Sequence, residues 1–184
     1  MIPLQAFLFL IGSVIIVYIS RASLRDPRSH GFYRFFAWEF ILGLILLNVP
    51  CWFCDPFAWH QIVSWVLLCA SLIPLILGVQ LLRSAGKPDE TRNDAPMLGF
   101  EKTTELVTVG LYKYIRHPLY SSLLLLTWGT FFKSPALPGA LLALAATLCL
   151  TATAKAEEAE NMRYFGAAYQ TYIQQTKMFI PFLF

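Results

Sequence analysis

The sequence predicts an all-α fold, a polytopic membrane helical bundle of about five transmembrane helices in a single domain, residues 1–184. Three observations carry this prediction: long apolar runs, few charged residues, and lysines and arginines confined almost entirely to one side. Of the 184 residues, 57% are hydrophobic and 14% are charged, whereas a soluble domain carries about 25% charged residues. Such a chain has too few charges to cover a water-facing surface, so we expect lipid to be part of its solvent.

The predicted spans are five apolar runs separated by polar or helix-breaking segments. A helix needs roughly 20 apolar residues to cross the hydrocarbon core of a bilayer. The last two runs are shorter than this and are joined by a turn rich in proline, so we expect them to form a tight hairpin. The five runs cover residues 2–20, 35–53, 58–82, 119–132 and 139–154. The chain then divides into three N-terminal spans (1–82), a cytosolic connection (83–117), the helical hairpin (118–156) and a C-terminal helix and tail (157–184).

The orientation follows from the basic residues. Thirteen of the fourteen lysines and arginines lie between the first and second spans, after the third span or after the fifth, and only Lys133 lies on the other side. The positive-inside rule assigns the side with thirteen to the cytosol. The N-terminus is then outside and the C-terminus is cytosolic, as five spans require.

Chemistry is expected on the cytosolic side, because only the long connection and the tail offer sizeable surface there. At membrane depth the main ionisable residue is Glu39. It either reaches the interface beside Arg34 or lines a cavity that opens to the cytosol, where it would contact substrate. The lack of a trail of charges through the spans argues against an ion channel or a proton-coupled transporter.

The first candidate motif precedes the fourth span. Pro118 suits the first position of a helix, which makes His117 the cap. The free amides that follow, with the helix dipole, form an anion site, and Arg116 adds a permanent charge beside it. Three tyrosines are placed to wall such a pocket: Tyr112, Tyr114 and Tyr120. The alternative is an interfacial belt of aromatic residues and arginine that only anchors the helix.

The second candidate motif continues the fifth span into the cytosol. At helical spacing, Glu158 shares a stripe with Met162, Phe165 and Tyr169. A neighbouring stripe contains Glu157, Asn161 and Tyr164. A carboxylate beside an aromatic face suits a cationic ligand or the hydroxyls of a ribose. The alternative is a solvated acidic turn on an interfacial helix.

Together the two motifs resemble the isoprenylcysteine carboxyl methyltransferase family, within the wider group of membrane phospholipid and small-molecule methyltransferases. The resemblance covers roughly residues 98 to 181. The matching residues are Leu106-Val107-Thr108-Val109-Gly110-Leu111-Tyr112, Arg116-His117-Pro118-Leu119-Tyr120, Glu157-Glu158, Phe165-Gly166-Ala167-Ala168-Tyr169, Tyr172 and Pro181.

The resemblance implies an enzyme that methylates with S-adenosylmethionine and releases S-adenosylhomocysteine. Arg116 and Glu158 become the candidate catalytic residues. The implied contacts to the methyl donor are Glu105, Leu106, Val107, Tyr112, His117, Pro118, Leu119, Tyr120 and Glu157. The implied acceptor is the carboxylate of an isoprenylated cysteine or a similar lipidic acid that enters from the bilayer. An ionised carboxylate needs no general base, so catalysis would come from alignment and exclusion of water.

The sequence departs from the pattern of this family at one position that concerns the methyl acceptor. Eukaryotic members of the family carry an arginine about one turn before the two glutamates, and here that stretch reads Thr151-Ala152-Thr153-Ala154-Lys155. Lys155, Arg163 or Arg116 would have to hold the acceptor instead. The short chain indicates a prokaryotic relative in the cytoplasmic membrane.

Three other functions remain open at this point: a lipid amine methyltransferase, a membrane lipid reductase that uses a nicotinamide cofactor, and a non-catalytic lipid-binding protein. The expected partners are the acceptor and membrane lipids, with neither nucleic acid nor metal, and the expected state is a monomer.

Overall fold

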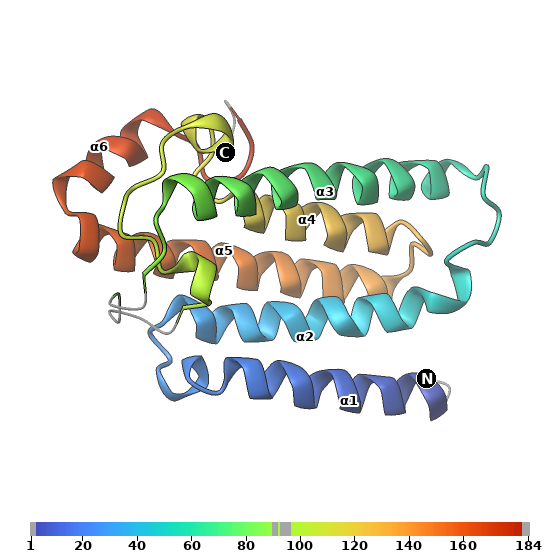
Figure 1. Ribbon diagram of the computed structural model, residues 1–184. Coiled ribbons are helices and arrows are strands. Elements are labelled where there is room, and N and C mark those ends of the chain that lie inside the picture. The colour runs from blue at the N-terminus through green and yellow to red at the C-terminus, as the bar shows by residue number, and fades with distance from the viewer. Residues whose placement is uncertain (1–2, 90–91, 93–96, 182–184) are drawn as a thin grey trace.

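The computed structural model describes residues 3–89, 92 and 97–181, in which five apolar helices lie side by side (Figure 1). The helical bundle predicted from the sequence is therefore confirmed. The α-helices are α1 (Pro3–Ser20), α2 (His30–Asn48), α3 (Trp59–Ala85), α4 (Pro118–Phe131), α5 (Leu137–Phe165) and the short α6 (Ala167–Gln175). Four 3₁₀ turns accompany them: η1 (Ser23–Arg25), η2 (Val49–Cys51), η3 (Gly99–Glu101) and η4 (Gly110–Lys113).

Three of the described helical segments are long and apolar enough to cross a membrane on their own, namely His30–Cys51, Trp59–Ala85 and Leu137–Phe165. Helix α1 is shorter, and α4 has 14 residues. At about 1.5 Å per residue, α4 is shorter than the roughly 30 Å of a hydrocarbon core. The expected hairpin is therefore asymmetric, because α5 is 29 residues long and carries the second motif on its last turns.

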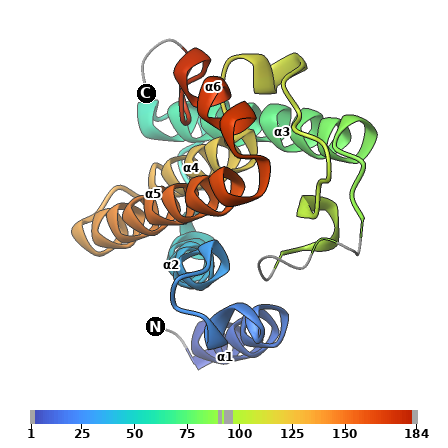
Figure 2. The same ribbon diagram turned by 90° about the vertical axis from the view of Figure 1, so that its left-hand side faces the viewer.

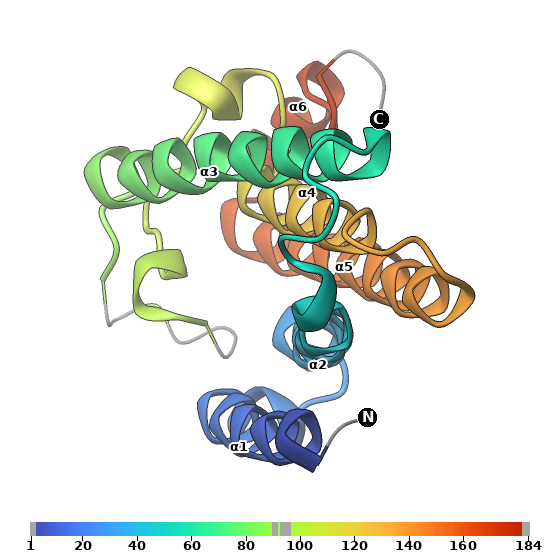
Figure 3. The ribbon, with the colours of Figure 1, turned by 90° about the vertical axis from the view of Figure 1, so that its right-hand side faces the viewer.

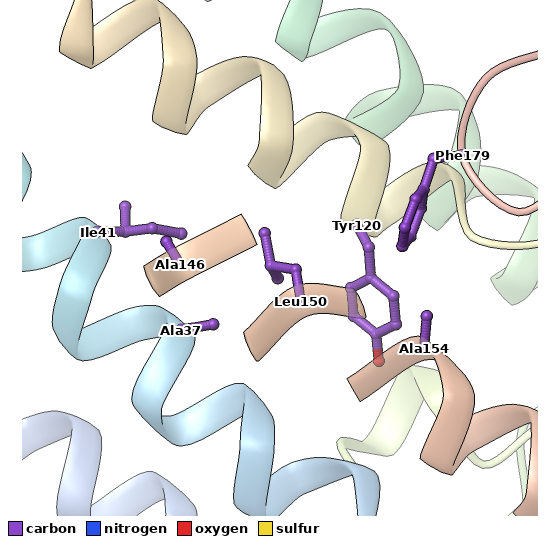
Figure 4. Close-up of a cluster of buried hydrophobic side chains, with 7 residues drawn as sticks. All are labelled: Ala37, Ile41, Tyr120, Ala146, Leu150, Ala154 and Phe179. Atoms are coloured by element: carbon purple, nitrogen blue, oxygen red, sulfur yellow. The ribbon is translucent and has the colours of Figure 1, made fainter. Parts of the chain in front are cut away.

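Helix packing joins two pairs, α2 with α5 and α3 with α4, and α1 packs on α2 (Figures 2 and 3). The centre of the bundle contains alanines of α2 and α5 that let these helices approach closely. Figure 4 shows this core, formed by Ala37, Ile41, Tyr120, Ala146, Leu150, Ala154 and Phe179. In contrast, the outward faces of α1 and α3 expose large apolar side chains such as Val14 and Val66, as expected of helices that face lipid.

Both motifs lie at one end of the bundle. The connection 21–29, the described residues 86–89 and 97–117, and residues 166–181 gather at this end, whereas the start of α1 and the short connections 49–58 and 132–136 lie at the other (Figure 1). The thirteen basic residues therefore belong to the motif end, and Lys133 to the opposite end. Which end faces the cytosol stays a prediction.

Two glycines of the motifs have backbone conformations that other residues rarely adopt. Gly110 starts η4 with φ +60°, and Gly166 separates α5 from α6 with φ +58°. Glycine has no Cβ and reaches such angles at little cost. A Cβ at Gly110 would also lie 2.7 Å from the side chain of Leu81. The two glycines thus set the turns that bring η4 and α6 over the end of the bundle.

Candidate functional site

A pocket opens at the motif end, between the connection that follows α3, the start of α4, the last turns of α5, and α6. The volume that the centre of a water molecule can reach inside it is about 70 Å³. Its walls are His30, Leu82, Met97, Glu101, Thr103, Leu106, Val107, Tyr112, Arg116, His117, Pro118, Leu119, Tyr120, Glu157, Asn161, Phe165, Tyr169 and Tyr172.

The chain after α6 holds the first motif in place. The backbone amide of Arg116 donates to the carbonyl of Lys177 at 2.8 Å, and that of His117 donates to Met178 at 3.2 Å. The hydroxyl of Tyr172 donates to the carbonyl of Tyr112 at 2.7 Å. These bonds tie the segment before α4 to the end of the described chain, so the His117–Pro118 helix start has a fixed position in the pocket.

Arg116 is held in place by its neighbours. Its Nε donates to Oε1 of Glu158 at 2.6 Å, and its Nη1 donates to the carbonyl of Thr176 at 2.5 Å and to that of Ile173 at 3.3 Å. The Nε2 atom of His117 lies 3.2 Å from the same Glu158 oxygen. Arg116 and Glu158 therefore form a partly buried pair that fixes the imidazole of His117.

The second glutamate of the motif points toward α4. The hydroxyl of Tyr120 donates to Oε2 of Glu157 at 2.5 Å, and Nδ1 of His117 lies 3.8 Å from the same oxygen. The rings of His117 and Tyr120 stack with their centroids 5.4 Å apart. The two motifs, separated along the sequence by the whole hairpin, thus meet across one pocket.

Four ionisable residues at this site were not predicted. His30 and Glu101 line the pocket. The Nη1 atom of Arg34 donates to both carboxylate oxygens of Glu101, at 2.6 and 2.7 Å, and Glu160 accepts from His30. Their sequence signals are weak, since His30 and Arg34 stand in the first turns of an apolar helix and Glu160 lies one turn after Glu157. The packing of α2 against α5 brings His30 and Glu160 together, and Glu101 of η3 joins them through Arg34.

The carboxyl of Glu101 is ionised over the whole physiological range. Burial by itself would raise its pKa, but the guanidinium of Arg34 and the imidazole of His30 outweigh burial and lower the pKa to about 2. Burial and then the nearby carboxylate of Glu157 raise the pKa of the Tyr112 and Tyr169 phenols. Both hydroxyls therefore stay protonated and available as hydrogen-bond donors at neutral pH.

The charge and shape of the walls favour a ligand with positive charge and hydroxyl groups. Among the charged side chains that line the pocket, Glu101 already pairs with Arg34 and Arg116 already pairs with Glu158, which leaves Glu157 as the acidic side chain without a guanidinium partner among the described residues. Tyrosine and phenylalanine rings line the same space and attract cations. An ionised carboxylate such as that of Glu157 is also a good acceptor for the hydroxyls of a sugar.

Of the residues predicted for the site, nine line the pocket: Leu106, Val107, Tyr112, Arg116, His117, Pro118, Leu119, Tyr120 and Glu157. Glu158 lies directly behind Arg116. The others lie elsewhere in the described structure. Glu105 is exposed and pairs with Lys87 at 2.6 Å, and Lys155 and Arg163 are exposed on α5.

Glu39 does not line the pocket either. It faces α1, where the hydroxyl of Ser13 donates to its Oε2 at 2.6 Å. A connection between this carboxylate and the pocket is absent from the described contacts. The expectation that Glu39 opens to the cytosolic cavity therefore has no structural support, because the helix face that carries it packs on α1 and not on α5.

A bundle of apolar helices with a pocket of polar and aromatic side chains at one end is the architecture of an integral membrane protein with a candidate ligand site at that end. The family model described as phospholipid methyltransferase matches residues 75–171, more than half of the 184 residues, from the middle of α3 into α6. The chain therefore belongs to the phospholipid methyltransferase family, a group of membrane methyltransferases that includes the isoprenylcysteine carboxyl methyltransferase type. The expected class of protein, an integral membrane methyltransferase, is confirmed at this level.

One relative is methanethiol S-methyltransferase 2 of Bradyrhizobium diazoefficiens, which is 40% identical over 76 residues. This alignment covers 40% of the chain and 28% of that protein, so the chain spans less than a third of the length of the curated relative it matches. No solved structure matches the chain. The family is thus established for the segment that contains both motifs, while the methyl donor and the acceptor are matters of proposal.

Proposed function

We propose that this protein transfers the methyl group of S-adenosylmethionine to an acceptor that reaches the pocket from the bilayer. The observation that carries the proposal is the meeting of the His117–Pro118 helix start with Glu157 across a pocket lined by aromatic rings. S-adenosylmethionine combines a sulfonium cation, a ribose with two hydroxyls and an amino acid group. The chain offers a partner of suitable chemistry for each.

The residues that would hold the donor follow from the chemistry of the walls. The carboxylate of Glu157 would accept hydrogen bonds from the ribose hydroxyls. The faces of Tyr112, Tyr169 and Phe165 would attract the sulfonium. The first amides of α4, after Pro118, would meet the carboxylate of the donor. Apolar contacts would come from Leu106, Val107 and Leu119.

When bound, the donor would supply an electrophilic methyl group. The residues of the chain would contribute alignment and the exclusion of water rather than covalent chemistry. In this proposal Arg116 and Glu158 are positioning residues. Their pair at 2.6 Å fixes His117, and so fixes the wall against which the donor lies.

The acceptor would enter along an apolar groove at the side of the bundle. The groove is lined by Leu67, Ser121, Leu124, Leu125, Trp128, Thr147, Thr151, Phe179, Ile180 and Pro181. One of its residues, Phe179, lies beside the pocket, with its ring centroid 6.2 Å from that of His117. Such a groove suits the apolar tail of a membrane-dissolved acceptor. The isoprenylcysteine carboxylate implied by the resemblance and a lipophilic thiol or amine are the candidate reacting groups.

The pocket would face the cytosol of a prokaryotic cell, from which the water-soluble donor would enter. The supporting observation is the accumulation of thirteen basic residues at the pocket end, which the positive-inside rule assigns to the cytosol. Since one chain contains every residue named for the pocket, we propose that a monomer suffices.

Titration calorimetry of the purified protein with S-adenosylhomocysteine tests this proposal. We expect saturable binding, weakened at least about tenfold in Glu157→Ala and in His117→Ala, because each loses a charge-assisted or aromatic contact worth more than about 1.4 kcal/mol. Asp55→Asn, at the opposite end of the bundle, is the matched control and should bind as the wild type does. Absence of saturable binding in the wild type, both in detergent and in bilayers, would sink the proposal.

The two remaining functions predict different results. If the protein were a nicotinamide-dependent reductase, reduced nicotinamide dinucleotide would displace S-adenosylhomocysteine. We expect no displacement, because the carboxylates of Glu101 and Glu157 in the pocket would repel the pyrophosphate of the dinucleotide. A non-catalytic lipid-binding protein would keep its lipid affinity in Glu157→Ala and bind neither cofactor.

A further inference from the structure

A buried ion pair between His30 and Glu160 lies beside the proposed donor site. His30 begins α2, its side chain is 1% exposed, and it lines the pocket. Its Nδ1 lies 2.6 Å from Oε2 of Glu160, and its backbone amide donates to Oε1 of that residue at 2.8 Å. Glu160 follows Glu157 by less than one turn of α5. The imidazole is therefore held next to the carboxylate proposed for the ribose.

The imidazole of His30 carries a proton on both nitrogens. Glu160 is 2% exposed, and among the described residues its hydrogen bonds come from His30 alone. A buried carboxylate needs a countercharge, and the guanidinium of Arg34 already pairs with Glu101. The imidazolium is therefore the countercharge of Glu160, which makes Nδ1 and Nε2 both hydrogen-bond donors.

One of these two donors is unused. The Nε2 atom is buried and has no hydrogen-bond partner in the part of the chain that the structure describes. Oε2 of Glu101 lies 3.8 Å away, which is beyond hydrogen-bond length. That oxygen already accepts from Arg34 and from the amide of Leu98, at 2.7 and 2.9 Å. Buried donors without an acceptor are uncommon, and an acceptor atom of a ligand in the pocket would complete this one.

The neighbouring carboxylate of Glu101 has an unused acceptor position. It also lines the pocket, and its two oxygens offer about four lone-pair positions in total. Oε2 accepts from two donors, whereas Oε1 accepts from Arg34 alone among the residues described, at 2.6 Å. The wall of the pocket thus presents one free donor and one free acceptor on adjacent side chains.

A free donor beside a free acceptor is complementary to a ligand edge that carries an acceptor beside a donor. Adenine has such an edge, because its 6-amino group donates while the ring nitrogens on either side, N1 and N7, accept. A carboxylate ligand would satisfy Nε2 of His30 but would be repelled by Glu101 in a medium of low polarity. Adenine is also the part of S-adenosylmethionine to which no residue has yet been assigned.

We infer that His30 and Glu101 bind the adenine of the methyl donor. Nε2 of His30 donates to N1 or N7 of the base, and Oε1 of Glu101 accepts from its 6-amino group. This inference rests on the proposed function and extends the donor site to α2, outside the matched residues 75–171. Arg34 and Glu160 are then positioning residues, since each holds one of the two adenine-binding side chains through an ion pair.

Analogues of S-adenosylhomocysteine that lack one ring nitrogen test the contact of His30. Titration calorimetry should show that the wild type binds either the 1-deaza or the 7-deaza analogue at least about tenfold more weakly than the parent compound. This is the usual worth of a hydrogen bond to a charged group. The other analogue, which keeps the contacted nitrogen, should bind as the parent does.

The variant His30→Asn should lose this discrimination. The side-chain amide of asparagine can donate to Glu160 as Nδ1 does, but no atom replaces Nε2, so the parent and both deaza analogues should bind with similar affinity. His60→Asn is the matched control and should discriminate as the wild type does, because His60 lies at the opposite end of the bundle with its Nδ1 3.1 Å from the carbonyl of Phe132.

S-inosylhomocysteine, which has a carbonyl oxygen in place of the 6-amino group, tests the contact of Glu101. The wild type should prefer S-adenosylhomocysteine by at least about tenfold, because Oε1 of Glu101 would meet a second acceptor. Glu101→Gln should narrow this preference, since the amide of glutamine can donate to the oxygen. Glu105→Gln is the matched control and should keep the preference, because Glu105 is exposed and pairs with Lys87.

A spectroscopic measurement decides the matter if His30→Asn fails to fold. In the ¹⁵N-histidine-labelled wild type, the Nε2 resonance of His30 should shift when S-adenosylhomocysteine is added, whereas that of His60 should not. An unresponsive resonance, or equal binding of the parent and both deaza analogues by the wild type, would overturn the inference. Discrimination that persists in His30→Asn would mean that His30 is only structural. In contrast, a wild type that binds no S-adenosylhomocysteine would refute the proposed function itself.

Discussion

The imidazole Nδ1 of His30 lies 2.6 Å from the carboxylate of Glu160, although the two residues are 130 positions apart in the sequence. This contact joins the first turn of α2 to the last turns of α5, the two helices that form the centre of the bundle. It ties the membrane part of the protein to the wall of the pocket. Changes at the pocket end should therefore be measurable as changes in the stability of the whole bundle.

Acid should destabilise the protein through Glu101. Its pKa in the folded protein is lowered to about 2, from an ordinary value of 4.5. A lowered pKa stabilises the fold at pH values above 4.5, and this contribution is lost as the pH falls from about 4.5 to about 2. We expect a loss of up to about 3 kcal/mol from this group, measured as Tm against pH in detergent.

Glu101→Gln is the control for that titration. It cannot ionise, so its Tm should be lower at pH 7 and should fall less steeply between pH 5 and 2 than that of the wild type. Parallel curves for the two proteins would show that Glu101 does not titrate in this range.

Burial should give one ion pair a larger coupling free energy than another ion pair with the same distance between its charged atoms. The Arg116–Glu158 and Lys87–Glu105 pairs are both 2.6 Å long, but the side chains of the first are 9% and 16% exposed and those of the second 68% and 54%. Double-mutant cycles to alanine should give a coupling of about 1–3 kcal/mol for the buried pair and less than about 1 kcal/mol for the exposed pair. Equal couplings would contradict this account.

Glycine should be needed at position 166 because of the positive φ angle there, and not because a larger side chain would clash with its neighbours. Neither Gly166 nor Gly99 has another atom within 4 Å of a Cβ built on it, but only Gly166 has a positive φ, of +58°. Gly166→Ala should therefore cost about 1–3 kcal/mol of stability. Gly99→Ala, the matched control, should stay within about 0.5 kcal/mol of the wild type. Chemical denaturation in detergent compares the three proteins, and a harmless Gly166→Ala would refute the argument.

The orientation can be read from thiol labelling of intact cells. Cys54 is exposed at the end opposite the pocket, and Lys113 is exposed at the pocket end. A membrane-impermeant maleimide should label Cys54 in intact cells. It should label Lys113→Cys, in a background with the four native cysteines replaced by serine, only after the membrane is opened. The reverse pattern would place the pocket outside the cell.

Several properties could be derived from the sequence because they depend on local composition. Apolar runs gave the five helices, since a helix in lipid satisfies its own backbone and needs only a suitable length of apolar side chains. Pro118 marked a helix start, because its backbone preference acts within one turn. The helix end at Gly166 was not predicted, since the stripe from Glu158 to Tyr169 was treated as one continuous helix, whereas α5 ends at Phe165 and α6 begins at Ala167. The two motifs also identified most of the pocket wall, from Leu106 to Tyr120 and at Glu157.

Tertiary structure alone decided the other half of the site. Nothing near His30 in the sequence indicates a partner, and only the packing of α2 against α5 brings Glu160 within hydrogen-bond distance of it. Arg34 of α2 and Glu101 of η3 are likewise 67 positions apart and meet only in the folded chain. Conversely, Glu105 belongs to a matching segment but points to solvent and pairs with Lys87. Through local chemistry, the sequence thus determined the helices, the proposed orientation and the part of the pocket wall that the two motifs form. Long-range packing decided which charged side chains meet in the pocket. Ion pairs between segments far apart in the sequence leave no periodic pattern along the chain.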